Sequence, residues 1–120
     1  MEITLELKVD DVIRAAQENG LNWGRDHFYD GKTSCILGIA ARNILGNNTP
    51  LVPEDIGEFS EYLAEKLPYR LGSLIAAYND GPARSFSDAL RFLVDQLTPF
   101  KDEIITLDLA RYFTDYDEEE

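Results

Sequence analysis

The chain has 120 residues, a length that one domain with its own hydrophobic core commonly has. Its 23 acidic and 11 basic residues give a formal net charge of −12, and such a charge repels nucleic acids and anionic membranes. A single cysteine excludes an internal disulfide, and no apolar run approaches the roughly 18 residues that a membrane helix needs. We therefore predict a cytoplasmic protein that binds neither nucleic acid nor membrane directly.

The two ends of the chain carry similar alternating patterns. Residues 2–8 read EITLELK, and residues 103–113 read EIITLDLARYF, with apolar side chains at every second position over most of each stretch. This period predicts half-buried strands, and we expect the two strands to pair antiparallel. For the second segment, a helix over about residues 106–116 is the alternative.

The first two helices are expected between these ends. Asp10 or Asp11 can cap the first helix, which we expect to end at Gly20. The second helix is expected from Thr33 or Ser34 to about residue 45, and apolar side chains cover nearly its whole circumference. A helix that is apolar all round is buried all round, so we expect it to be central.

The third helix is the clearest amphipathic segment. Pro53 suits its first position. Its apolar stripe consists of Ile56, Phe59, Leu63 and Leu67. Its acidic stripe consists of Glu54, Glu58, Glu61 and Glu65.

Two further helices complete the expected bundle. Pro68 interrupts the chain before a short helix over residues 69–78, in which Gly72 allows close approach of a neighbouring helix. Ser85 starts the fifth helix as its cap, and Pro99 ends it.

We therefore predict a mainly α (α+β) fold: a compact bundle of about five helices with a small two-stranded antiparallel element from the N- and C-terminal segments. Residues 1–114 are expected to form a single globular domain, and residues 115–120 an acidic tail without fixed structure. Because an isolated pair of strands is marginally stable, a homodimer through the terminal strands is a further hypothesis.

The stretch DGKTSCILG over residues 30–38 resembles the end of a phosphate-binding loop. The loop motif needs a glycine five residues before its last glycine, and that position is Asp26. Aspartates also repel phosphate where backbone N–H groups should bind it. A turn and a helix start are sufficient to explain the stretch, so we expect no nucleotide and no cofactor.

Cys35 is the one candidate nucleophile that we consider. It lies near the predicted start of a helix, where the helix dipole lowers a thiol pKa, and His27 could serve as its base with Asp80 as an orienting group. A cysteine-dependent hydrolase is therefore the alternative function, although a buried structural cysteine explains the same residue. One histidine and one cysteine cannot supply a zinc site, so we expect no metal.

The acidic residues favour a different function, a non-enzymatic module that binds a basic surface of another protein. Carboxylates on a rigid helix can imitate the phosphate row of nucleic acid, as an inhibitor from a phage or mobile element would. From residue 54 to residue 65 a helix rises about 16 Å. The candidate binding residues are Glu54, Glu58, Glu61, Glu65, Asp115 and Asp117.

Several motif residues give the chain a resemblance to a known group of domains. The pattern consists of Trp23, Asp30-Gly31, Cys35-Ile36-Leu37-Gly38, Tyr78-Asn79-Asp80, Pro82 and Ser85. Over about residues 12–97 the chain resembles a family of small bacterial and phage-borne domains of unknown function. The resemblance implies a fold and no activity, and it implies that these residues serve as caps, turns and close contacts.

Overall fold

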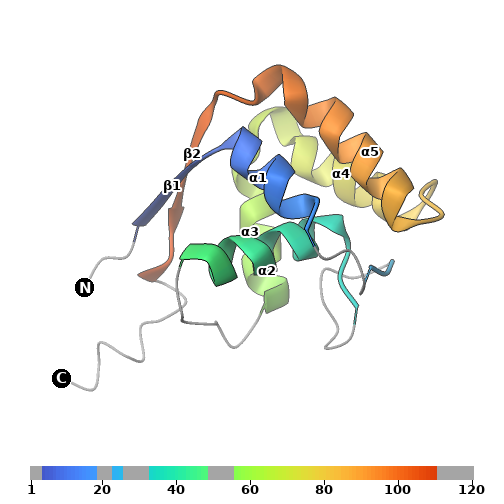
Figure 1. Ribbon diagram of the computed structural model, residues 1–120, viewed down its shortest axis with the longest axis horizontal. Coiled ribbons are helices and arrows are strands. Elements are labelled where there is room, and N and C mark those ends of the chain that lie inside the picture. The colour runs from blue at the N-terminus through green and yellow to red at the C-terminus, as the bar shows by residue number, and fades with distance from the viewer. Residues whose placement is uncertain (1–3, 19–22, 26–32, 49–55, 111–120) are drawn as a thin grey trace.

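The computed structural model describes residues 4–18, 23–25, 33–48 and 56–110 (Figure 1). Within them, five α-helices form a compact globule with a two-stranded antiparallel sheet. In chain order the elements are β1 (Thr4–Lys8), α1 (Val9–Ala16), α2 (Ile36–Asn48), α3 (Ile56–Lys66), the 3₁₀ turn η2 (Pro68–Arg70), α4 (Leu71–Asp80), α5 (Phe86–Leu97), the 3₁₀ turn η3 (Thr98–Phe100) and β2 (Ile104–Asp108). The predicted fold class is confirmed. No helix in the described ranges combines the length and apolar character needed to cross a membrane.

The sheet joins the two predicted terminal strands. They pair antiparallel, and the buried Leu7 lies opposite the buried Ile105. Buried and exposed side chains alternate along β2, as the sequence pattern predicts. The alternative helix is wrong where it can be tested, because residues 104–108 form this strand; residues 111–116 lie outside the described residues.

The first helix follows β1 without a connecting loop. The N–H of Val9 donates to the carbonyl of Glu103 at 2.8 Å, so pairing with the second strand continues into the first helical residue. The N–H of Lys8 donates to the carboxylate of Asp11 at 2.9 Å. The predicted cap at Asp10 or Asp11 is therefore wrong, because the helix begins two or three residues earlier than that cap requires. Asp11 lies in the first turn, and its carboxylate accepts the N–H of the N-cap residue Lys8, as the acidic residue of a capping box does.

Two helices end away from their predicted residues. The first stops at Ala16, before Gly20. There the side-chain amide of Asn43 donates to the carbonyl of Ala15 at 2.8 Å and to that of Glu18, just beyond the helix, at 2.9 Å. An amide from α2 thus takes the role that a glycine cap was expected to fill. The second continues past residue 45 to Asn48, because Gly46 permits a turn without requiring one.

The central helix begins at Ile36, so the predicted start at Thr33 or Ser34 is wrong. The backbone of Ser34 is used in another contact, since its carbonyl accepts the N–H of Gly24 at 2.8 Å. The carbonyl of Cys35 accepts the first hydrogen bond of the helix. The contact with residue 24 therefore keeps Ser34 outside the helix.

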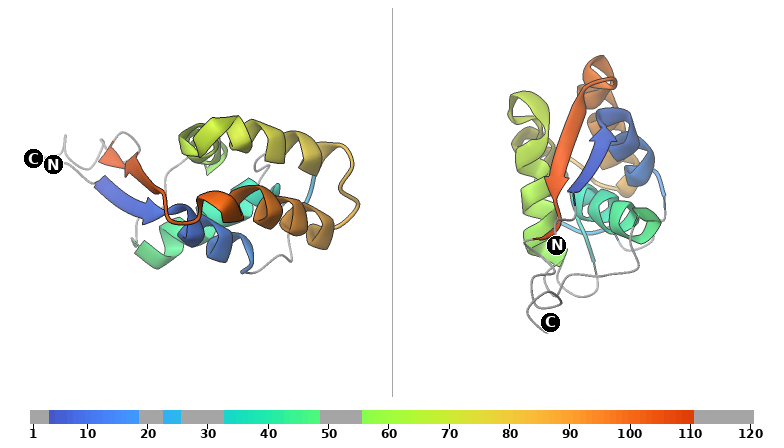
Figure 2. Two further views of the ribbon diagram at one scale, coloured as in Figure 1. Left: turned by 90° about the horizontal axis from the view of Figure 1, so that it is seen from above. Right: turned by 90° about the vertical axis from the view of Figure 1, so that its left-hand side faces the viewer.

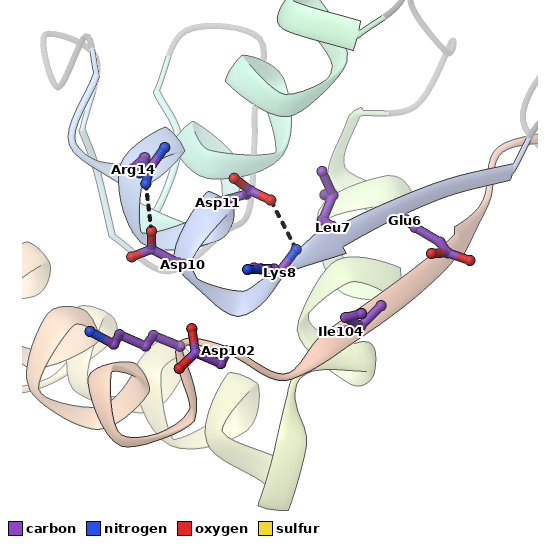
Figure 3. A pocket seen from close by; sticks show the side chains of 9 residues that line it. Glu6, Leu7, Lys8, Asp10, Asp11, Arg14, Asp102 and Ile104 are labelled. Carbon is purple, nitrogen blue, oxygen red and sulfur yellow. Dashed lines mark hydrogen bonds and ion pairs between the residues drawn. The ribbon is translucent and has the colours of Figure 1, made fainter.

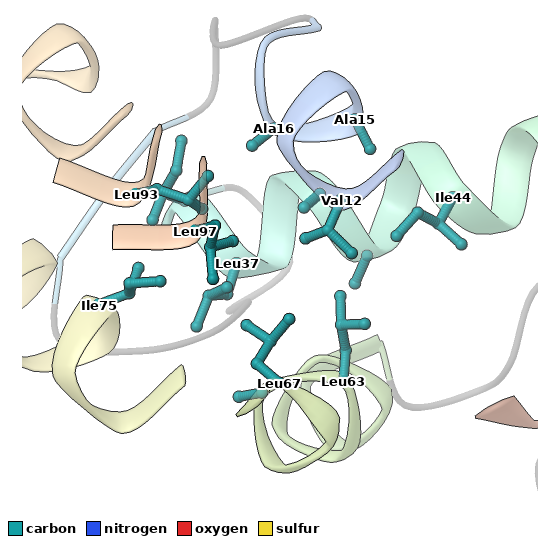
Figure 4. Packing of buried hydrophobic residues seen from close by; sticks show 14 of the residues in the cluster. Val12, Ala15, Ala16, Leu37, Ile44, Leu63, Leu67, Ile75, Leu93 and Leu97 are labelled. Carbon is teal, nitrogen blue, oxygen red and sulfur yellow. The ribbon is translucent and has the colours of Figure 1, made fainter. Parts of the chain in front are cut away.

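The hydrophobic core surrounds α2. Every residue from 35 to 41 is buried, and α2 contacts α1, α3, α4 and α5, as expected for a central helix. Figure 4 shows Leu37 and Ile44 among side chains from the neighbouring helices. Each fully buried leucine of this kind stabilises the fold by about 1.5–3 kcal/mol.

Pro68 separates α3 from α4, as predicted. The fourth helix covers Leu71–Asp80 instead of residues 69–78 because Tyr69 and Arg70 have φ values of 54° and 59°. These left-handed conformations cost roughly 1–2 kcal/mol per residue outside glycine. They turn the chain sharply, so that the start of α4 packs against the end of α3.

Gly72 makes this close contact between α3 and α4 possible. A Cβ atom built on Gly72 would lie 2.1 Å from the carbonyl oxygen of Ala64 in α3. The two backbones are therefore in contact at a distance that admits only a hydrogen atom, which confirms the close approach expected from the sequence.

The fifth helix starts as predicted. The hydroxyl of Ser85 accepts the N–H of Asp88 at 3.2 Å, and the carboxylate of Asp88 accepts the N–H of Arg84. The helix ends at Leu97, two residues before Pro99, which lies in the following 3₁₀ turn.

We expect the substitution Gly72→Ala to lower the free energy of unfolding by about 3 kcal/mol or more, because the added methyl overlaps a backbone oxygen that cannot move freely. Urea unfolding followed by the fluorescence of Trp23, the only tryptophan, measures this. Gly46→Ala is the matched control, since a Cβ there meets nothing within 4 Å. That variant should be more stable by about 0.5–1 kcal/mol. Equal unfolding midpoints for the two variants would contradict the close packing of α3 and α4.

Candidate functional site

The side chain of Asn79 joins three separate parts of the chain. It lies on the last turn of α4 and is fully buried. Its carbonyl oxygen accepts the indole N–H of Trp23 at 2.7 Å and the backbone N–H of Ile36 at 3.1 Å. Its amide nitrogen donates to the carbonyl of Gly24 and to the carboxylate of Asp80, both at 3.1 Å. An amide has two donors and two acceptor sites, so this one is saturated.

Arg25 adds a second connection between the same segments. Its guanidinium donates to the carbonyl of Asp80 at 3.1 Å and also to the carbonyl of Gly81. These carbonyls lie at the C-terminal end of α4, where a positive charge is favourable. The segment 23–25 is therefore fixed to α4 by both its tryptophan and its arginine.

Cys35 lies directly before the first residue of α2 and is only 2% exposed. Burial raises the pKa of its thiol from 9.0 to about 11, although hydrogen bonds from the N–H groups of Gly38 and Leu37 act in the opposite direction. The nearby carboxylate of Asp80 also raises this pKa. The thiol is therefore protonated at neutral pH, and it serves as a buried helix cap.

The geometry does not favour the hydrolase alternative. A nucleophilic cysteine needs an exposed thiolate, whereas Cys35 is neither exposed nor ionised near pH 7. His27, the expected base, lies outside the described residues. Asp80 is close to the sulfur, but its negative charge disfavours the thiolate.

The motif residues divide into three groups. Those brought together around the buried amide are Trp23, Cys35, Asn79 and Asp80. Those placed elsewhere are Gly38 in the first turn of α2, Pro82 in the exposed connection after α4, and Ser85 at the start of α5. Asp30 and Gly31 lie outside the described residues. Asn79 and Trp23 are joined by a hydrogen bond, and Ser85 caps α5.

Ser34 is the exception to the saturation of this region. Its hydroxyl is fully buried and has no hydrogen-bond partner among the described atoms. A buried hydroxyl without a partner destabilises a fold by about 1–3 kcal/mol. Its backbone nevertheless holds the contact with Gly24, which explains why the chain passes through this position.

The acidic face of α3 is a second candidate site. The exposed side chains Glu58, Glu61 and Glu65 lie on it, while Phe59 and Leu63 on the opposite side are fully buried. The predicted amphipathic division is thus confirmed for the described part of the helix. Glu54, Asp115 and Asp117, which complete the predicted set, lie outside the described residues.

A surface hollow of about 550 Å³ is the third candidate (Figure 3). It lies where β1 meets α1, and a neighbouring hollow of about 400 Å³ continues along the same strand. Glu6, Leu7, Asp11 and Arg14 line both. Figure 3 shows Asp11 hydrogen-bonded to the backbone of Lys8. No sequence motif predicts this site, although the change from an alternating to a helical pattern at Lys8–Val9 marks the junction that creates it.

Within the described ranges, no three histidine, cysteine, aspartate or glutamate side chains are placed to hold a metal ion. Comparison of the chain with protein-family models, with curated proteins and with solved structures finds no match. The resemblance to small bacterial and phage-borne domains therefore stays a prediction.

We expect Asn79→Ala to lower the free energy of unfolding by about 3 kcal/mol or more. It leaves the buried N–H of Ile36 and two half-buried partners, the indole N–H of Trp23 and the carbonyl of Gly24, without their hydrogen bonds, and a fully buried group in that state costs about 1–3 kcal/mol. Asn79→Asp keeps the shape of the side chain but loses the donor to Gly24, so it should also destabilise strongly. Ser87→Ala on the exposed side of α5 should change stability by less than about 0.5 kcal/mol. Urea titration compares the three. An Asn79→Asp variant as stable as the wild type would contradict the assignment of these hydrogen bonds.

We expect Cys35 to react with iodoacetamide at pH 7 at least about 100-fold more slowly in the folded protein than in urea, since two pKa units reduce the thiolate fraction that much. The raised pKa also makes stability depend on pH. The unfolded thiol ionises with a pKa of 9.0, and the folded thiol with a pKa of about 11. The free energy of unfolding is therefore unaffected by this group below pH 9.0, and it falls as the pH rises from 9.0 toward 11. Cys35→Ala lacks this titration and is the control. Fast labelling of the folded protein at pH 7 would restore the hydrolase alternative.

Proposed function

We propose that the protein is a small acidic, non-enzymatic module that binds a basic surface of another protein through the exposed face of α3. The observation that carries the proposal is the row formed by Glu58, Glu61 and Glu65 on a helix whose other side is anchored in the core. A charge row on an anchored helix keeps its spacing, whereas the same charges on a flexible segment do not.

The dimensions of this row support a partner that normally binds nucleic acid. Glu58 and Glu65 are separated by a rise of about 10 Å, with one further carboxylate between them. A nucleic-acid duplex presents one charge per about 3.4 Å of its axis on each strand. The row therefore has the sign and the linear order of the phosphates of one strand, with one charge per about 5 Å against one per about 3.4 Å, which is about two-thirds of the linear charge density. An inhibitor from a phage or mobile element that mimics nucleic acid is the specific form of this proposal.

The net charge of the whole chain gives further support. At −12 it favours approach to a basic surface and opposes approach to nucleic acid. The hydrolase alternative lacks comparable support, because Cys35 is buried and its thiol pKa is raised to about 11.

The test compares two variants of equal net charge. One replaces Glu58, Glu61 and Glu65 by glutamine, and the other neutralises three exposed acids elsewhere, as Asp95→Asn, Asp102→Asn and Glu103→Gln. Each is immobilised and exposed to host extract, with washes at low and high salt and elution by duplex DNA.

We expect the wild type and the second variant to retain a basic protein that duplex DNA displaces, because the α3 row is intact in both. The first variant should not retain it, and high salt should release it from the wild type and from the second variant. Equal capture by both variants would contradict a role for the α3 face. A captured protein that duplex DNA does not elute would contradict the mimicry of nucleic acid.

A further inference from the structure

The hydrogen-bond pattern identifies which backbone groups of β1 face away from β2. In an antiparallel pair, residues alternate between those that bond to the partner strand and those that point outward. Since the N–H of Val9 bonds to Glu103, the groups of Leu7 also face β2, and those of Glu6 point outward. The N–H of Lys8 confirms this direction, because it is bound by Asp11 on the side away from β2.

The outer edge of β2 is covered in part by α3. By the same alternation the N–H of Asp108 points outward, and it donates to the hydroxyl of Tyr62 at 2.9 Å. Figure 2 shows β2 lying between β1 and α3. The edge of β1 differs, because within the part of the chain that the structure describes no group bonds to the outward N–H and C=O of Glu6.

A hollow lies beside this unpaired edge. Its volume is about 400 Å³, which lies in the range of ligand sites, about 300–1,000 Å³. Asp11 places the hollow on the outward side of β1, since it both binds the outward N–H of Lys8 and lines the hollow. The lining residues are Glu6, Leu7, Asp11, Arg14, Ala15, Glu18 and Ile44. An added strand would lie about 4.8 Å from β1 and so would enter this space.

The charges around the hollow define what it accepts. Glu6, Asp11 and Glu18 are acidic. Arg14, the one base among the described residues that line this hollow, is paired with Asp10 at 2.9 Å. A second copy of the chain would bring another net charge of −12 to this edge, which opposes pairing between copies. A basic segment has the complementary charge.

We propose that the edge of β1 is a strand-addition site, at which an extended segment of another protein that carries lysine or arginine pairs with the backbone of Glu6 between β1 and α1. Backbone hydrogen bonds would give this interaction its geometry, and the acidic lining would give it its charge preference. This site is separate from the acidic face of α3, and it does not depend on the function proposed for that face.

The test uses a short synthetic peptide that alternates lysine with valine as the probe, and the full chain labelled with ¹⁵N. Titration should shift the amide signal of Glu6, slow its hydrogen exchange and leave the amides of Glu58 and Glu61 unchanged. The same peptide with alternate backbone nitrogens methylated keeps its charge but cannot form the pairing hydrogen bonds. It should bind at least about tenfold more weakly, as expected when backbone hydrogen bonds are lost.

A pair of variants examines the protein side of the same contact. Glu6→Pro removes the outward N–H but no bond to β2, and proline is tolerated in edge strands. Glu6→Gln removes the charge and retains the N–H. We expect Glu6→Pro to abolish the peptide-induced amide shifts of the residues beside it. Glu6→Gln should weaken peptide binding only moderately, and raising the salt concentration should reduce the affinity of the wild type more than that of Glu6→Gln.

Three results would overturn the proposal. The first is equal binding of the methylated and unmethylated peptides, because it would show that charge alone is recognised. This comparison uses the wild-type protein, so it remains valid even if Glu6→Pro does not fold. The second is equal binding by a glutamate–valine peptide. The third is a dimer in sedimentation equilibrium with a protected Glu6 amide, which would identify a second copy of the chain as the occupant.

Discussion

The position of the central helix depends on one side-chain amide. Asn79 reaches from the end of α4 to the first N–H of α2 and, at the same time, to the segment that carries Trp23. All of its hydrogen-bonding groups are used inside the protein, where an unpaired polar group is costly. Because α2 contacts α1, α3, α4 and α5, the position of its first residue determines where those four helices pack against it.

This constraint also explains why Cys35 has a structural character. The residue follows the segment held by Gly24 and precedes the helix start held by Asn79, so its side chain is confined to the core. Helix N–H groups favour a thiolate, but burial has the larger effect and raises the thiol pKa. The position of a cysteine near a helix start is therefore a weak guide to reactivity when its burial is unknown.

The two proposed binding surfaces lie away from Asn79 and the start of α2. On one side of the sheet, α3 covers the edge of β2 and turns Glu58, Glu61 and Glu65 to solvent. On the other side, β1 retains an outward backbone edge next to an acidic hollow. Both surfaces favour basic partners, but the first presents side-chain charge on a helix and the second adds backbone pairing. The two proposals thus assign basic partners to two physically different kinds of surface.

The sequence by itself determined the features that arise from local periodicity. Alternation specified β2, the apolar circumference of residues 35–41 specified a buried helix, and Ser85 specified the start of α5, because each of these signals lies within a few neighbouring residues. Tertiary structure decided where α2 begins and what Asn79 binds, since both depend on residues more than forty positions apart in the sequence. It also decided which sheet edge is covered. Strand alternation assigns the faces of a strand, whereas only the packing of α3 against β2 determines which edge stays open.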